Sequence, residues 1–260
     1  MNTVAAPCRA NGLRGIHNMG STCFMSVILQ SFVHNPLLRN FFLSDGHQTG
    51  DCTREHCMNC AMDDLFQDFY AQDKIDGFSA SNVLHNSWAC RQAAFASLAG
   101  YEEQDAHEFF QFLAQELHRT NKADNGQNNI DDDAIGSKSD EFCNCIIHQT
   151  FYGKSQSTVT CQNCDGITTS VEPFLDLSLG LNNMARKRQK QNGVKQRPLT
   201  LQRCLDEEYK RPERCEYTCQ TCNGPQDARK QLSIKRLPNV LCVQFKVCSR
   251  SLLANLEFED

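Results

Sequence analysis

The chain has 260 residues, of which 40% are hydrophobic and 22% charged, and its net charge is -5 at pH 7. This length permits one large domain with insertions or two small ones. No run approaches the roughly 18 apolar residues of a membrane span, residues 1–15 hold no apolar signal segment, and the acidic balance disfavours a nucleic-acid binder. Sixteen cysteines without a secretory signal favour reduced thiols that bind metal or act in catalysis.

The first half of the chain predicts helices. Residues 12–43 are dense in apolar residues, and a helix is expected to start at Thr22 or Cys23 and to end before Asn35-Pro36, where proline disfavours its continuation. Its predicted buried stripe consists of Phe24, Val27, Ile28 and Ser31. The strongest helical pattern covers residues 104–119, where Ala106, Phe109, Phe110, Leu113 and Leu117 recur at three- and four-residue steps.

The later half predicts strands, because its apolar residues alternate at Leu175, Leu177 and Leu179 and again at Leu241, Val243, Phe245 and Val247. Helices followed by strands favour an α+β fold over a doubly wound sheet. Residues 120–140 and 182–197 are poor in apolar residues and are expected to form solvated loops. The basic run at residues 186–188 leaves a nuclear-import or nucleic-acid patch as the alternative.

Two Cys-x2-Cys pairs, Cys161 with Cys164 and Cys219 with Cys222, predict a structural zinc site. Each pair places two thiolates on one tight turn, and two such turns complete a tetrahedron. The alternatives are two unrelated pairs of buried thiols, or a redox motif, which would need only one copy in a βαβ setting.

A second cluster contains His47, Cys52, Cys57 and Cys60 on a polar segment. Four closely spaced soft ligands predict another closed zinc site, whose binding energy substitutes for a missing apolar core. His56 is an alternative ligand.

A third cluster supplies Cys143, Cys145 and His148, with His118 at the end of the predicted amphipathic helix as the candidate fourth ligand. A metal would then close the polar segment between them at small entropic cost. The alternative is that His118 caps the helix C-terminus, where a cation is favoured.

Cys23 stands at the expected first turn of an apolar helix, after a glycine turn. Backbone N–H groups at a helix N-terminus favour a thiolate, the form that a nucleophile needs, and the Asn18 amide is a candidate oxyanion donor. Taken alone, the pattern fits a small buried hydrophobic cysteine better.

Several motifs together resemble the ubiquitin-specific proteases. Residues 12–25 (GLRGIHNMGSTCFM) resemble the cysteine box of that family, and residues 101–110 (YEEQDAHEFF) resemble its second box. Residues 175–178, the paired Cys-x2-Cys motifs and residues 237–246 resemble further family elements in the same order. The flanking sequence and the extra His/Cys clusters are most similar to the deubiquitinase subfamily of the SAGA transcriptional coactivator complex, which supports the third metal site.

The resemblance implies a papain-like α+β catalytic domain over residues 12–246, with a zinc-bearing β extension, the fingers, that grips ubiquitin. It implies that Cys23 is the nucleophile, Asn18 the oxyanion amide, and Asp105, with its neighbour Gln104, a contact for the ubiquitin tail. It further implies up to three structural Zn²⁺ ions, ubiquitylated histone H2B as substrate, SAGA deubiquitinase-module subunits as partners, and a nuclear location without membrane or direct sequence-specific nucleic-acid binding.

Two departures from the family pattern stand out. Ser21 replaces the usual second Asn, and residues 247–260 leave the pattern, so no histidine box follows. We therefore expect residues 1–11 to be a short tail, residues 247–260 a non-family tail, and the chain to be truncated and unable to turn over ubiquitin conjugates. The alternatives are a catalytically dead, zinc-stabilised scaffold that binds ubiquitin or partner subunits, and a zinc-binding nucleic-acid module.

Overall fold

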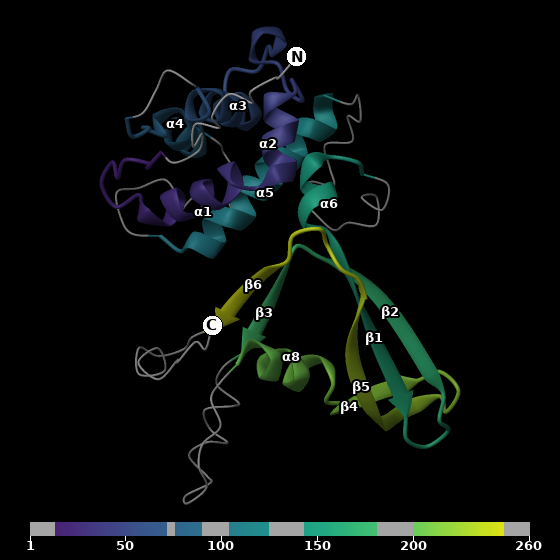
Figure 1. The fold of residues 1–260 in the computed structure, drawn as a ribbon. Coiled ribbons are helices and arrows are strands. Elements are labelled where there is room, and N and C mark those ends of the chain that lie inside the picture. Colours follow the sequence, from purple (N-terminus) through teal and green to yellow (C-terminus); the bar gives the residue numbers. More distant parts are fainter. Residues whose placement is uncertain (1–13, 72–75, 90–103, 125–142, 181–199, 247–260) are drawn as a thin grey trace, which may run out of the picture. The chain divides into compact units, whose positions relative to one another are not determined.

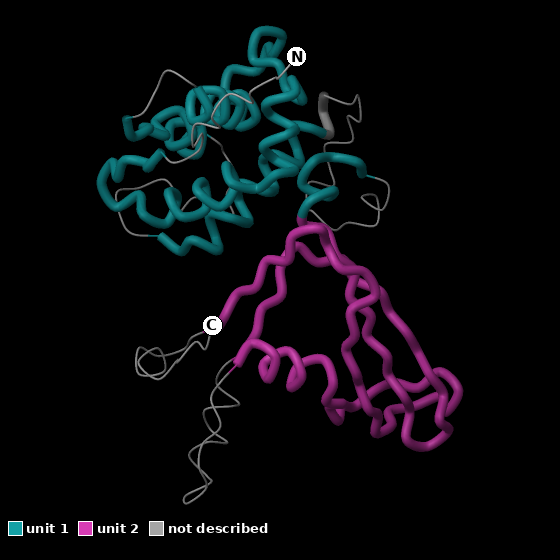
Figure 2. The backbone as a smooth tube through the Cα atoms, viewed as in Figure 1, with its two compact units in different colours: residues 1–150 teal, residues 151–260 magenta. Residues whose placement is uncertain are grey.

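The computed structural model describes residues 14–71, 76–89, 104–124, 143–180 and 200–246. The chain divides into two compact units, residues 1–150 and residues 151–260, which Figure 2 shows in different colours. The described part of unit 1 is helical and unit 2 is built mainly from strands, so the predicted α+β fold is confirmed. No helix among the described residues is long and apolar enough to cross a membrane.

Unit 1 is a helical body (Figure 1). Its elements are α1 (Cys23–Val33), α2 (Pro36–Leu43), the 3-10 turn η1 (Thr49–Asp51), α3 (Met58–Phe69), α4 (Ser81–Ala89), α5 (Ala106–Asp124) and α6 (Ile146–Phe151), whose last residue belongs to unit 2. Helix α1 ends at Val33 with His34 as its C-cap, and Asn35 starts the second helix, because its side chain accepts hydrogen bonds from the N–H groups of Leu37 and Leu38 and Pro36 occupies the first turn.

The core of unit 1 is aromatic and aliphatic. Phe42 of α2 stacks on Phe66 of α3 with 4.8 Å between ring centroids, and both side chains are fully buried. Phe24 of α1 meets Phe109 of α5 edge to face at 5.6 Å. Each such side chain contributes about 1.5–3 kcal/mol through burial, so the first contact holds α2 on α3 and the second holds α1 on α5.

Helix α1 starts at Cys23 and ends before Asn35-Pro36 as predicted, but part of its predicted buried stripe is wrong. Val27 is 53% exposed and Ser31 is also exposed, whereas the residues that face the core are Phe24, Met25, Leu29, Phe32 and Val33. Apolar residues occur on almost every side of this helix, so periodicity alone did not fix its inward face.

Helix α5 buries Phe109, Phe110, Leu113 and Leu117 as predicted, while Ala106 is half-buried. It continues past residue 119, so the predicted loop at residues 120–124 is wrong.

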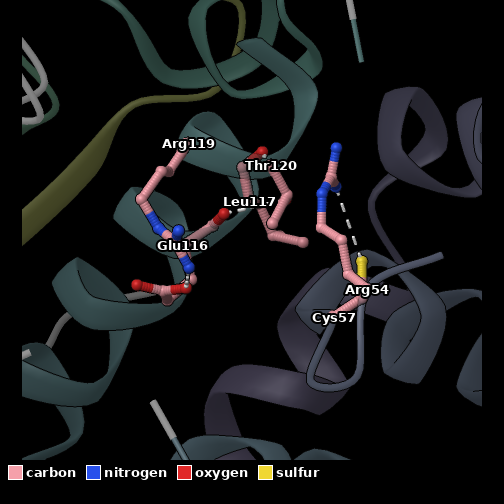
Figure 3. Close-up of polar contacts among 6 residues, drawn as sticks. All are labelled: Arg54, Cys57, Glu116, Leu117, Arg119 and Thr120. Carbon is pink, nitrogen blue, oxygen red and sulfur yellow. Dashed lines mark hydrogen bonds and ion pairs between the residues drawn. The ribbon is translucent and has the colours of Figure 1, made fainter. Parts of the chain in front are cut away.

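The polar residues of this extension are tied to the preceding turn. The Thr120 hydroxyl donates to the Glu116 carbonyl at 2.8 Å and the Asn121 amide donates to the Leu117 carbonyl at 2.8 Å (Figure 3 shows the Thr120 contacts). Both side chains are buried, and tertiary packing therefore overrides their composition.

Unit 2 contains a four-stranded antiparallel sheet in the order β2-β1-β5-β4. Its strands are β1 (Gly153–Cys161), β2 (Ile167–Phe174), β4 (Glu213–Cys219) and β5 (Gly224–Arg236). Strands β1 and β2 form one hairpin, β4 and β5 form another, and the pairing of β1 with β5 joins them. Each hairpin carries one Cys-x2-Cys motif at its turn.

A second, two-stranded parallel sheet pairs β3 (Asp176–Gly180) with β6 (Cys242–Lys246). The predicted alternation is confirmed in β3, where Leu177 and Leu179 are buried, and Val243 and Phe245 of β6 pack with Cys204 of α8 (Leu201–Tyr209). Leu241 is exposed and Leu175 lies before β3, so the prediction is wrong for these two residues. Val247 and the predicted segments at residues 1–11, 125–140, 182–197 and 247–260 lie outside the described residues.

Candidate active site and metal centres

The turn before α1 presents Cys23 to solvent. Gly20 and Ser21 both have positive φ, 95° and 49°, a conformation that reverses the chain immediately before the helix. Cys23 is the first residue of α1, and its side chain is exposed. Cys23 is therefore not the small buried hydrophobic residue that the pattern alone favoured.

The Asn18 side chain is anchored through its oxygen. Its Oδ1 accepts hydrogen bonds from the Gly20 N–H at 3.1 Å, the Thr22 N–H at 3.2 Å and the Thr22 hydroxyl at 3.1 Å. Because backbone N–H groups only donate, these contacts fix which end of the amide is oxygen. The Nδ2 donors take no part in these bonds, and Asn18 is an exposed residue five positions before Cys23.

Asp105 lies at the start of α5, where its Oδ1 accepts the His107 N–H at 2.7 Å. This carboxylate caps the helix, and it is exposed, while Gln104 is half-buried. Phe24, next to Cys23, packs on Phe109 of the same helix. The aromatic contact therefore brings the first turns of α1 and α5 together.

No described residue forms a hydrogen bond with the Cys23 thiol. His107 is the histidine nearest by motif, and it instead contacts the Gln111 amide at 3.4 Å and stacks on Phe110.

The fingers motifs converge as predicted. Cys161, Cys164, Cys219 and Cys222 have all their sulfurs within 4.8 Å of one another, including contacts of 4.0 Å between Cys161 and Cys222 and 3.5 Å between Cys164 and Cys219. Tetrahedral zinc thiolates have sulfurs roughly 3.8 Å apart. The residues that follow the two motifs, Asp165 and Asn223, have φ of 54° and 53°, so both turns close in the same way.

The second cluster uses His47 and not the alternative His56, whose ring lies 5.8 Å from that of His85. His47 Nε2 lies 3.1 Å from the Cys60 sulfur and 3.8 Å from the Cys57 sulfur, and Cys52 completes the group within 4.8 Å. Nitrogen and sulfur ligands of zinc lie roughly 3.6 Å apart. These distances fit a closed metal site.

The third cluster joins His118 of α5 to Cys143, Cys145 and His148. The Cys145 sulfur lies 3.3 Å from His118 Nδ1 and 3.2 Å from His148 Nδ1, and the Cys143 sulfur lies 3.7 Å from His118 Nδ1. Because α5 continues to Asp124, His118 is inside the helix and does not cap its end. Both histidines are buried.

Hydrogen bonds within these groups shift the pKa values of neighbouring thiols in opposite directions, which favours a cation. Contacts with Cys145 lower the pKa of Cys143 to about 2, and the same pairing raises the pKa of Cys145. In the fingers, the Cys222 N–H lowers the pKa of Cys219 to about 6, while the Cys164 side chain raises that of Cys222 to about 12. Ionisation of one thiol therefore disfavours ionisation of its neighbour, and a bound divalent metal would stabilise both thiolates.

Sequence reasoning missed two residues that support the sulfurs. Arg54 directs its guanidinium at the Cys57 sulfur, with 3.8 Å from Nη1 to Sγ (Figure 3). Asn163 donates from Nδ2 to the Cys222 sulfur at 3.5 Å. Both are polar residues that lie between two cysteines of their own motif. This position was the sequence signal that could have identified them as supporting residues.

Residues 14–254 match the family model described as ubiquitin carboxyl-terminal hydrolase, and the chain belongs to this family. It is 38% identical over 240 residues to the probable ubiquitin carboxyl-terminal hydrolase 8 of Schizosaccharomyces pombe, covering 92% of this chain and 46% of that protein. It is 37% identical over 254 residues to ubiquitin carboxyl-terminal hydrolase 22 of Homo sapiens, covering 90% of this chain and 45% of that protein. The chain thus spans slightly less than half the length of these relatives.

Among solved structures, the chain matches the SAGA Ubp8/Sgf11/Sus1/Sgf73 DUB module bound to ubiquitin aldehyde with a TM-score of 0.70 and 34% identity, covering 94% of this chain and 49% of that chain. The same module with a Ubp8 variant, bound to monoubiquitin, matches with a TM-score of 0.66 and 33% identity, covering 91% of this chain and 48% of that chain. The predicted papain-like ubiquitin-specific protease fold is confirmed by this likeness.

Proposed function

We propose that this chain carries the nucleophile and a ubiquitin-binding surface of a thiol-dependent deubiquitinase that cleaves the isopeptide bond at the ubiquitin C-terminus. The observation that carries the proposal is the turn at residues 18–23, where an exposed thiol follows an amide whose oxygen is anchored and whose donors take no part in those bonds. Membership of the ubiquitin carboxyl-terminal hydrolase family supports the bond at the ubiquitin C-terminus as the one that is cleaved.

In this mechanism the Cys23 sulfur attacks the carbonyl carbon of the isopeptide bond, and the carbonyl π electrons move to oxygen. The Asn18 Nδ2 group donates a hydrogen bond to that oxygen as its negative charge develops. Asp105, exposed at the start of α5, contacts the ubiquitin tail together with Gln104. A general base takes the Cys23 thiol proton, and collapse to the acyl-enzyme breaks the C–N bond and expels the lysine amine, which takes a proton from a general acid. Water then hydrolyses the thioester, which releases the ubiquitin carboxylate and restores the Cys23 thiol.

The three clusters hold structural Zn²⁺ in this proposal. Closed sets of four nitrogen and sulfur donors suit zinc, and at these sites the ion supplies folding energy and takes no part in the reaction. The ligands are His47, Cys52, Cys57 and Cys60; His118, Cys143, Cys145 and His148; and Cys161, Cys164, Cys219 and Cys222.

The substrate and partners are proposed from the relatives. The structural neighbours are SAGA modules that contain Ubp8 with Sgf11, Sus1 and Sgf73, bound to ubiquitin aldehyde or to monoubiquitin. From these neighbours we propose ubiquitin as ligand and subunits of such a deubiquitinase module as partners. The resemblance to the SAGA deubiquitinase subfamily supports ubiquitylated histone H2B as substrate and the nucleus as location.

The test is labelling of the chain by ubiquitin that carries a C-terminal vinyl sulfone, an electrophile that needs only a nucleophile and a bound tail. Cys23→Ala should abolish labelling, whereas Cys242→Ala should leave it unchanged. Cys242 is a suitable control because burial and the Asp176 carboxylate raise its pKa to about 11, which keeps it protonated at neutral pH. Labelling that survives Cys23→Ala would refute the proposal.

A second function, a ubiquitin-binding scaffold without turnover, is favoured by the lack of a described hydrogen-bond partner for Cys23. Hydrolysis of a fluorogenic ubiquitin C-terminal amide separates the two. Rates equal to those of Cys23→Ala, combined with intact labelling, would support the scaffold, and faster rates would support the enzyme.

A further inference from the structure

The Thr22 side chain does not do what threonine before a helix usually does. A threonine at this position normally accepts a hydrogen bond from the first turn of the helix, but Thr22 makes no such capping bond to α1. Its hydroxyl faces the preceding turn, where it accepts the Met19 N–H at 3.0 Å and lies 3.1 Å from Asn18 Oδ1. The side chain is 4% exposed, so this geometry is protected from water.

The direction of these bonds is determined. Met19 N–H can only donate, so the Thr22 hydroxyl accepts there and gives its own proton to Asn18 Oδ1. Thr22 also donates its backbone N–H to the same oxygen at 3.2 Å. One residue thus supplies two of the three hydrogen bonds that hold the Asn18 amide.

We propose that Thr22 is a positioning residue for the Asn18 oxyanion donor: its hydroxyl holds the amide oxygen so that Nδ2 faces the carbonyl attacked by Cys23. The inference rests on the proposed function. Thr22 touches no reacting atom in this role and acts only through Asn18.

Two ubiquitin probes separate positioning from general damage. With ubiquitin aldehyde, the Cys23 sulfur bonds to the aldehyde carbon and the C=O π pair moves to oxygen, which keeps the charge or takes the thiol proton. That oxygen needs the Asn18 donor. Ubiquitin vinyl sulfone is attacked at carbon and places no oxyanion at this point, so it reports on binding and on the thiol alone.

Thr22→Val removes the hydroxyl at nearly constant volume and should weaken ubiquitin aldehyde binding roughly fivefold, the value of one neutral hydrogen bond. Asn18→Ala should weaken it by about 100-fold. The double variant, Thr22→Val with Asn18→Ala, should bind ubiquitin aldehyde as strongly as Asn18→Ala alone, because Thr22 acts through Asn18. Vinyl sulfone labelling should change little in all three.

Two further variants complete the design. Thr22→Ser keeps the hydroxyl and should restore aldehyde binding, and it keeps the test usable if Thr22→Val unfolds. Ser31→Ala removes an exposed hydroxyl that only donates to the Val27 carbonyl at 3.0 Å, so it should behave as wild type. Unchanged aldehyde binding in Thr22→Val, additive losses in the double variant, or equal losses with both probes would overturn the role of Thr22. Failure of the wild-type chain with both probes would instead refute the proposed function, and the role with it.

Discussion

Helix α1 offers a direct test of which face turns inward. Leu29 is fully buried, so Leu29→Ala should lower the free energy of unfolding by about 3 kcal/mol through lost burial and a residual cavity. Val27 is 53% exposed, so in Val27→Ala the small loss of burial is offset by the better helix propensity of alanine, and the change should stay within about 0.5 kcal/mol. The corresponding loss in Tm for Leu29→Ala is roughly 6–12 °C.

Urea unfolding in reducing, zinc-containing buffer measures this difference. Trp88, the single tryptophan, lies on α4 in unit 1, so its fluorescence follows the unit that contains α1. The urea dependence of the unfolding free energy should be the same in both variants, which keeps the midpoints comparable. Equal destabilisation by the two substitutions, or a loss below about 1 kcal/mol for Leu29→Ala, would refute the assigned face.

The same face determines access to the nucleophile. Cys23, Val27 and Ser31 are spaced four residues apart and form one exposed stripe of α1. Burying Val27 and Ser31, as periodicity suggested, would turn Cys23 toward the core. We therefore expect Val27→Ala to keep full labelling by ubiquitin vinyl sulfone.

Three further outcomes are expected. Purified protein should contain roughly three zinc ions per chain by elemental analysis, one for each cluster, and a ratio near one would leave a single site standing. Cys161→Ser should lower that ratio by one and unfold the fingers, seen as lost amide protection in unit 2, while amide protection in unit 1 is retained; loss of protection in both units would contradict independent units. Asp105→Asn keeps the cap of α5 but removes the charge, so it should reduce the NMR shifts of the ubiquitin tail on titration without changing stability, and undiminished shifts would argue against a tail contact.

Spacing was sufficient to predict the cluster of His47, Cys52, Cys57 and Cys60, because ligands three to five positions apart meet if their segment folds locally. The fingers site was predicted from its repeated Cys-x2-Cys motif, whereas the site at His118 needed the family resemblance as well. The apolar periodicity of α5 was likewise sufficient to predict a helix and its buried side. Helix α1 differs, since its residues are apolar on most sides and only contacts such as Phe24 with Phe109 select the buried face. Such contacts join distant segments and leave no periodic signal.

The candidate active site shows a similar limit. Family resemblance pointed to Asn18 and Cys23, but the role of Thr22 depends on which way one hydroxyl turns. The usual preference of threonine for helix caps predicts the opposite direction. The extension of α5 over residues 120–124 was missed for a related reason, since polar side chains that bond to the preceding turn look like a loop in composition.

The layout of the fingers has a consequence for the speed of folding. Strands β1 and β5 pair residues as distant as Lys154 and Arg236, and a contact of that sequence separation forms slowly because the chain entropy is lost before the pairing is gained. The two hairpins are local and form early, and each presents two thiolates at its turn. A metal ion that bridges the turns shortens the search for the β1–β5 register. Refolding of unit 2 is therefore expected to accelerate with zinc concentration until capture of the ion is no longer the slow step.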